Sequence, residues 1–152
     1  MKTMTSRTPS STRRAVATLA CGLALCLGNG AMAQDKTLYE RLGGKPALEA
    51  VVGELWAITA KDARINQYFA HTKPEVFAGQ LVDFLCQASG GPCVYHGKDM
   101  VAAHTGMKIT EAEFMALAEN VSKAMDKFKV PSKEKDEVMG MLGGLKSATI
   151  NR

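Results

Sequence analysis

From residue 37 onward, apolar residues recur every three or four positions, which is the spacing of amphipathic helices. The four longest apolar stripes are Leu48, Val51, Val52, Leu55 and Trp56; Phe77, Leu81, Phe84 and Leu85; Phe114, Leu117, Val121 and Met125; and Val138, Met141, Leu142 and Leu145. No stretch alternates apolar and polar residues between turns in the manner of a β-strand. We therefore expect an all-α fold without internal repeats.

Local signals place the ends of these helices. A threonine followed three residues later by glutamate predicts a capping box at Thr37–Glu40, at Thr72–Glu75 and at Thr110–Glu113. Gly43-Gly44 should end a short first helix, and the run from Ser89 to Pro92 should end the helix that follows Thr72. A short helical piece is expected between Lys98 and His104, and one last helix is expected after Pro131.

The first 33 residues differ in composition from the rest. They contain four basic residues and no acidic residue, with an apolar run from Ala15 to Leu27 and an Ala31-Met32-Ala33 exit. This pattern is typical of a cleaved secretory signal, and Arg13-Arg14 leaves a twin-arginine route open. The alternative, an uncleaved membrane anchor, is disfavoured because the apolar run is too short to span a bilayer. We expect a signal peptide at 1–33, one domain at 34–152 and export to the periplasm.

Cleavage changes the charge of the protein. Four of the 19 basic residues leave with the signal, so the remainder carries as many basic as acidic residues. Zero formal charge argues against nucleic-acid binding and, after signal cleavage, against attraction to membranes. The lysines between Lys123 and Lys135 alternate with acidic residues, and we interpret them as a solvated surface.

Four cysteines and three histidines are the residues most suited to chemistry. Cys21 and Cys26 fall in the signal, whereas Cys86 and Cys93 remain as an even pair that can form a disulfide in an oxidising compartment. The sequence contains no Cys-x-x-Cys-His motif, so covalent haem attachment is not supported. It also contains no zinc-binding, hydrolase or phosphate-loop motif.

His104 is the one histidine with suggestive surroundings. It lies one helical turn after Met100. Several apolar residues of the neighbouring segments could line a site for a flat hydrophobic ligand: Phe69, Phe77, Leu81, Phe84, Leu85, Ile109 and Phe114. A neutral imidazole in such a pocket is what haem iron requires on one axial side. The pattern alone favours the other interpretation, an ordinary, hydrogen-bonded histidine beside a core.

An ordered set of motifs distinguishes the two interpretations. The segment from Leu38 to Gly44, then Phe84-Leu85 with Gly90-Gly91-Pro92, then Tyr95-x-Gly97-x-x-Met100-x-x-x-His104, resembles group I truncated haemoglobins over residues 36–150. The resemblance implies a truncated globin fold, a two-over-two helical sandwich around non-covalent haem b (iron protoporphyrin IX). The paired glycines then end shortened helices.

The resemblance also implies roles for individual residues. His104 matches the proximal iron ligand, and Phe69 matches the aromatic residue that packs on the haem face. Other positions expected to contact haem are Thr72, Phe77, Leu81, Phe84, Leu85, Tyr95, Met100, Ile109, Phe114 and Leu117. Of these, Thr72 and Tyr95 fall near the expected haem edge and propionates.

The distal side departs from the family pattern. Trp56 stands where a tyrosine hydroxyl usually bonds bound oxygen, Phe77 and Leu81 replace polar residues, and Gln80 lies nearby. A pocket with so few donors should stabilise bound oxygen weakly, whereas CO and NO depend less on a donor.

The function expected from this reading is binding of a diatomic gas (oxygen, NO or CO), with an unidentified reductase as partner. One alternative is a haem enzyme, either an NO dioxygenase or a peroxidase, although no distal acid–base group is evident. A second is an electron-transfer haem protein with His71 as the other axial ligand. A third is a haem-free helical interaction domain.

Overall fold

The computed structural model describes residues 35–152, and within that range it contains helices and no strand. The elements are α1 (Leu38–Leu42), α2 (Gly44–Thr59), the 3₁₀ helix η1 (Asn66–Phe69), α3 (Pro74–Ala88), α4 (Met100–His104), α5 (Glu111–Lys127), α6 (Ser132–Gly144) and α7 (Lys146–Thr149). The all-α prediction is therefore confirmed. The predicted signal peptide, with Cys21 and Cys26, lies outside the described residues.

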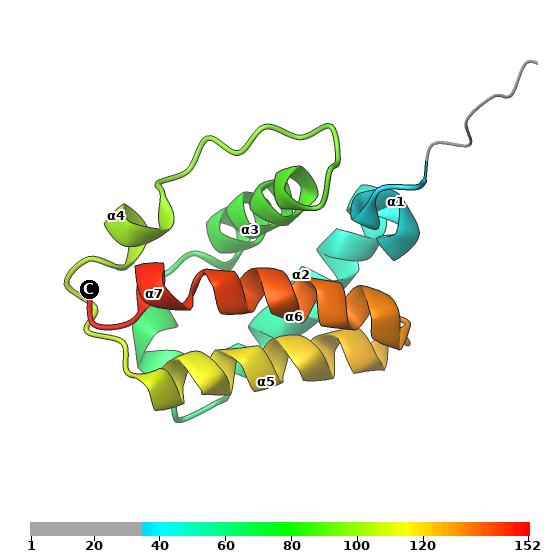
Figure 1. Ribbon diagram of the computed structural model, residues 1–152. Coiled ribbons are helices and arrows are strands. Elements are labelled where there is room, and N and C mark those ends of the chain that lie inside the picture. The colour runs from blue at the N-terminus through cyan, green and yellow to red at the C-terminus, as the bar shows by residue number, and fades with distance from the viewer. Residues whose placement is uncertain (1–34) are drawn as a thin grey trace, which may run out of the picture. The chain divides into compact units, whose positions relative to one another are not determined.

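Two pairs of long helices form the body of the domain (Figure 1). Helix α2 packs against α3, and α5 runs beside α6 after the chain reverses between them. The two pairs meet through α2 and α5, while α1 contacts α2 and α6, and α4 contacts α7. This is the two-over-two arrangement that the sequence predicts.

The short first helix shows how local chemistry sets the helix ends. Thr37 and Glu40 form the predicted capping box, with the Thr37 Oγ1 accepting from the Glu40 amide at 3.2 Å. Gly43 and Gly44 have φ values of +98° and +73°, which non-glycine residues rarely adopt. The glycines therefore let α2 start directly after α1 ends and redirect the chain.

Two other predictions about helix ends have different outcomes. The capping box at Thr110–Glu113 is present, but the one at Thr72–Glu75 is wrong. Helix α3 begins at Pro74, with Lys73 as an N-cap that makes no side-chain hydrogen bond. Proline suits the first helical position because its fixed φ is already helical and it lacks the N–H that would need a partner.

The chain after Pro131 also differs from the expectation of one last helix. Helix α6 ends at Gly144, and α7 forms a separate short turn of helix. Two consecutive glycines, Gly143 and Gly144, weaken the helix at this point because glycine loses more backbone entropy on folding than other residues.

A small core holds α2 and α3 together. It consists of Leu48 and Val52 from α2 with Val82 and Cys86 from α3, and each is almost completely buried. Fully burying a side chain such as Val52 contributes about 1.5–3 kcal/mol. This packing fixes the face of α3 that points toward the site described below.

A disulfide joins the end of α3 to the chain that follows it. Cys86 and Cys93, the pair named from the sequence, are bonded with their Cα atoms 5.7 Å apart. Gly91 lies inside this loop, where an added Cβ would stand 2.7 Å from both the Cys86 Sγ and the ring of Tyr39. Only glycine fits this close approach without movement of its neighbours.

Candidate functional site

A cavity of about 1080 Å³ lies between the helices, with walls from nearly every element. Every residue predicted to contact haem lines it: Phe69, Thr72, Phe77, Leu81, Phe84, Leu85, Tyr95, Met100, His104, Ile109, Phe114 and Leu117. Most of the lining is apolar, with His104 as its only histidine among the described residues. The structure thus brings residues from η1, α3, α4 and α5 to a single chamber.

Helix α4 holds His104 in a defined orientation. The Asp99 side chain caps this short helix by accepting from the Ala102 amide at 2.8 Å. The His104 Nδ1 lies 2.7 Å from the Met100 carbonyl oxygen, which can only accept, so we assign the proton to Nδ1. The Nε2 atom then carries a free lone pair and is available to bind a metal ion.

The segment before α4 is anchored to α3. The Tyr95 ring packs on Phe84 with the centroids 5.3 Å apart, and its hydroxyl donates to the Lys98 carbonyl at 2.9 Å. The Tyr95 amide donates to the Gln87 side chain at 2.6 Å. Together with the disulfide, these contacts hold the chain that leads to His104.

An aromatic cluster forms the opposite wall. Phe69 and Phe77 contact each other edge to face, with ring centroids 5.4 Å apart. Phe77, Leu81 and Phe84 all come from α3, and none of these side chains has a polar atom. Gln80 also borders the cavity, but its side chain is exposed and lies at the rim.

The structure differs from the sequence analysis at Trp56. Its indole packs against Phe69 and Phe77, with centroid distances of 6.0 and 5.3 Å, but Trp56 is not among the residues that line the cavity. The neighbouring Leu55, which is buried, faces the cavity instead. Trp56 therefore packs against two residues of the lining, Phe69 and Phe77.

One polar pair of the lining was missed from the sequence. Tyr68 donates its hydroxyl to Glu113 at 2.8 Å, and both side chains border the cavity. Burial and this bond raise the pKa of Tyr68. The Thr110 backbone and hydroxyl, followed by Tyr68, lower the pKa of Glu113. Residues 45 positions apart leave no pairing signal in the sequence.

The C-terminal helices contribute more of the lining than predicted. The additional residues from this part of the chain include Val121, Met125, Phe128, Val138, Met141, Leu142, Leu145 and Thr149. Most of them belong to the apolar stripes of the sequence, which indicated that these residues are buried but not which residues they pack against.

Among the described residues, no group of three or more His, Cys, Asp or Glu side chains could hold a metal ion. No helix in residues 35–152 has the length and apolarity needed to cross a bilayer.

The lining suits haem in size and chemistry. Its volume lies slightly above the roughly 300–1,000 Å³ typical of sites for small molecules and cofactors. A large apolar macrocycle requires apolar walls, and its iron requires one neutral imidazole. The Nδ1 bond to Met100 supplies the orienting contact that iron-ligating histidines need.

Comparison with known proteins agrees with this geometry. The family model for bacterial-like globins matches residues 37–151. The group 1 truncated hemoglobin of Tetrahymena thermophila is 35% identical over 109 residues, which cover 72% of this chain and 87% of the relative. GlbN of Nostoc sp. (strain MUN 8820), another group 1 truncated hemoglobin, is 33% identical over 116 residues, covering 76% of this chain and 98% of GlbN.

Solved structures show the same fold. The Fe(III) form of truncated hemoglobin from Tetrahymena pyriformis superposes with a TM-score of 0.74 at 29% identity, covering 77% of this chain and 100% of that one. The 2/2 hemoglobin of Synechococcus sp. PCC 7002 gives 0.72 at 29% identity, with the same coverage. The chain belongs to the bacterial-like globin family and, within it, to the group 1 truncated haemoglobins.

Proposed function

We propose that this protein binds haem b through the Nε2 atom of His104 and uses it to bind a diatomic gas. The observation that carries the proposal is the fixed imidazole: Nδ1 is held by the Met100 carbonyl at 2.7 Å, on the wall of a large apolar cavity. Membership of a globin family supports haem binding. Ferrous haem would supply an open axial position for oxygen, NO or CO.

The distal wall favours gases that need no hydrogen-bond donor. Phe77 and Leu81 present only carbon atoms to the cavity, and Trp56 packs against Phe69 and Phe77. A haem held here would bind oxygen more tightly if a hydrogen-bond donor were near, whereas CO would depend less on one. We therefore propose a high affinity for CO and NO relative to oxygen. The same wall lacks the acid–base group that peroxide cleavage requires.

Absorption spectra test the haem assignment. Protein purified with haem should show a Soret band that shifts on reduction and again on addition of CO. His104→Gly should lose stable haem binding and regain it with added imidazole. The matched controls are His71→Gly and His96→Gly, because both histidines are exposed. An unchanged ferrous spectrum and haem content in His104→Gly would refute the proposal, and a spectral change in His71→Gly would favour two histidine ligands.

We also propose that the domain is exported to the periplasm. The Cys86–Cys93 disulfide supports this, because such bonds persist in oxidising compartments. Mass spectrometry after alkylation without reduction, on protein recovered from the periplasm, should find neither cysteine modified and a new N-terminus near Gln34. Retention of residues 1–33, or two alkylated thiols, would contradict the proposal.

A further inference from the structure

Two irregular connections lead to residues that line the large cavity. The first, residues 60–73 between α2 and α3, contains η1 and carries Phe69. The second runs from Ser89 to Asp99 between α3 and α4, and it leads directly to the helix of His104. It contains no helix, and it is longer than the roughly four to six residues usual for connections within a domain. The position of His104 therefore depends on what holds this second connection.

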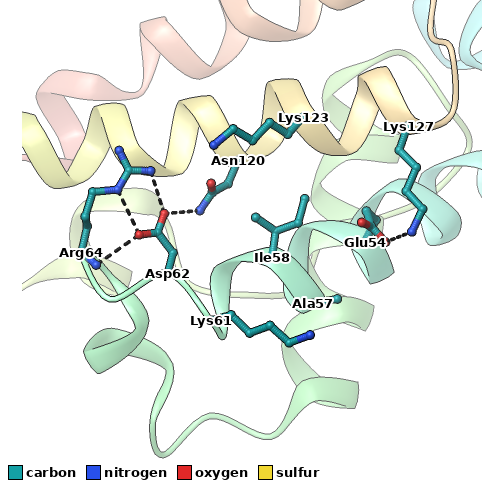
Figure 2. A pocket seen from close by; sticks show the side chains of 9 residues that line it. All are labelled: Glu54, Ala57, Ile58, Lys61, Asp62, Arg64, Asn120, Lys123 and Lys127. Atoms are coloured by element: carbon teal, nitrogen blue, oxygen red, sulfur yellow. Dashed lines mark hydrogen bonds and ion pairs between the residues drawn. The ribbon is translucent and has the colours of Figure 1, made fainter.

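The first connection is tied to α5 by polar side chains. Figure 2 shows Arg64 and Asn120 converging on the Asp62 carboxylate, beside a recess of about 620 Å³ between α2 and α5. Arg64 donates to this carboxylate at 3.0 and 2.8 Å, and Asn120, which is almost fully buried on α5, donates to it at 2.8 Å. Further along the chain, Tyr68 donates to Glu113. This connection is therefore fixed to α5 at two points by non-covalent contacts.

The second connection is held differently from Cys93 onward. Within residues 35–152, the segment 93–99 takes part in no ion pair. Its exposed residues are Val94, His96, Lys98 and Asp99. Its three contacts with the rest of the fold all reach the end of α3: the disulfide to Cys86, the Tyr95 ring on Phe84 and the Tyr95 amide on the Gln87 side chain.

The disulfide is the contact on which the other two depend. Gln87 is exposed, so water can replace its hydrogen bond to the Tyr95 amide at little cost. The Tyr95 ring packs on Phe84 only while the segment stays beside α3. Cys93, two residues before Tyr95, keeps it there, because the disulfide holds its Cα atom 5.7 Å from that of Cys86. Cys86 is itself fully buried in the core between α2 and α3.

We propose that a dithiol reductant regulates this site: it opens the Cys86–Cys93 disulfide, frees the segment 93–99 and thereby loosens the hold of His104 on haem. The inference rests on the proposed function, because it concerns regulation of the same site. In the oxidised protein, α4 is held by α3 through this segment and by its contacts with α7. After reduction the contacts with α7 remain, and the imidazole samples a wider range of positions.

The exposure of the two cysteines sets the order of the steps. Cys93 is half-buried and Cys86 is fully buried, so the first thiolate of the dithiol attacks the Cys93 Sγ. A mixed disulfide forms at Cys93, and Cys86 leaves as a thiolate. The second thiolate then attacks the reductant's own sulfur in the mixed disulfide and releases Cys93 as a thiolate. The dithiol becomes a disulfide, and its two electrons and two protons end on the two cysteines.

The rate of haem loss tests the proposal. Ferric protein purified with haem is mixed with excess apomyoglobin, and haem transfer is followed by absorbance, before and after treatment with dithiothreitol and its removal without air. Reduction, or the variant Cys93→Ser, should each raise the rate at least about fivefold, and reoxidation of the native protein should restore it. Dithiothreitol should not change the rate in Cys93→Ser, which has no disulfide to open. Ala118→Gly controls for a general loss of stability and should stay within about twofold of native, because Ala118 is buried in α5 and does not line the cavity.

Hydrogen exchange on the same preparations separates this proposal from the haem proposal, because the measurement does not require bound haem. Reduction should speed exchange at least about fivefold in residues 93–104, including the Ala102 and Ala103 amides that donate to Asp99, and should leave α5 and α6 within about twofold. A protein that binds no haem but shows this local increase supports control of the segment by the disulfide and refutes the haem assignment. The proposal is overturned if reduction changes haem loss, or exchange in residues 93–104, less than fivefold. It is also overturned if exchange rises equally in α5 and α6.

Discussion

Placing one hydrogen-bond donor in the distal wall should slow the release of oxygen. Leu81 lines the cavity from α3 and has no polar atom. Leu81→Gln places an amide N–H there, on a side chain of similar length, between the apolar residues Phe77 and Phe84. One neutral hydrogen bond contributes about 0.5–1.5 kcal/mol. Since 1.4 kcal/mol corresponds to a factor of ten, we expect oxygen dissociation to slow by about two- to tenfold. CO dissociation should change less than twofold.

Stopped-flow measurement of oxygen release from the ferrous protein, with CO as the trapping ligand, gives the rate. Leu81→Met is the matched control, because it replaces leucine with an unbranched apolar side chain of similar volume. Trp56→Phe is a second control: the indole does not line the cavity, so oxygen release should stay within twofold of native. Slow release by the native protein, or no change in Leu81→Gln at full haem content, would refute the view that the wall lacks a donor.

Three further predictions concern stability. Cys93→Ser opens the disulfide with Cys86, and by the loop-entropy model it should cost about 2.5 kcal/mol of unfolding free energy, measured by urea denaturation; an unchanged midpoint would contradict this. Gly91→Ala forces a Cβ to 2.7 Å from the Cys86 Sγ, and it should cost about 1–3 kcal/mol in the same assay, with Gly79→Ala as an unhindered control. Glu113 has a lowered pKa, chiefly because the backbone amide of the α5 N-cap donates to it. Its contribution to stability is therefore complete above the unfolded-state pKa of about 4.3 and is lost as the pH falls through the folded-state value. Melting temperatures between pH 6 and pH 3 should fall less steeply in Glu113→Gln, and parallel curves would contradict the assignment.

Features set by neighbouring residues were predictable from the sequence. The capping boxes at Thr37 and Thr110 require only a threonine and a glutamate three positions later, and both are present. The capping box at Thr72 is absent because α3 begins at Pro74, and a helix that begins with proline needs no side-chain cap. His104 could be singled out because the ordered motifs around it resemble a family, whereas its spacing from Met100 alone also suited an ordinary histidine.

Features set by helix rotation or by distant pairs were not predictable. Leu55 and Trp56 are adjacent and both lie on the apolar stripe of α2, and the pattern does not show which of them faces the cavity. Tyr68 and Glu113 meet only through the tertiary fold.

The hydrogen bond between His104 and Met100 would affect the reduction potential of a haem bound as proposed. The Nδ1 proton is shared with a neutral backbone carbonyl, and a carbonyl attracts it less strongly than a carboxylate would. The imidazole consequently keeps little anionic character, and it would donate less electron density to a bound iron than a carboxylate-paired histidine would. Since electron donation stabilises the ferric state, this arrangement would favour ferrous iron in a haem held as proposed.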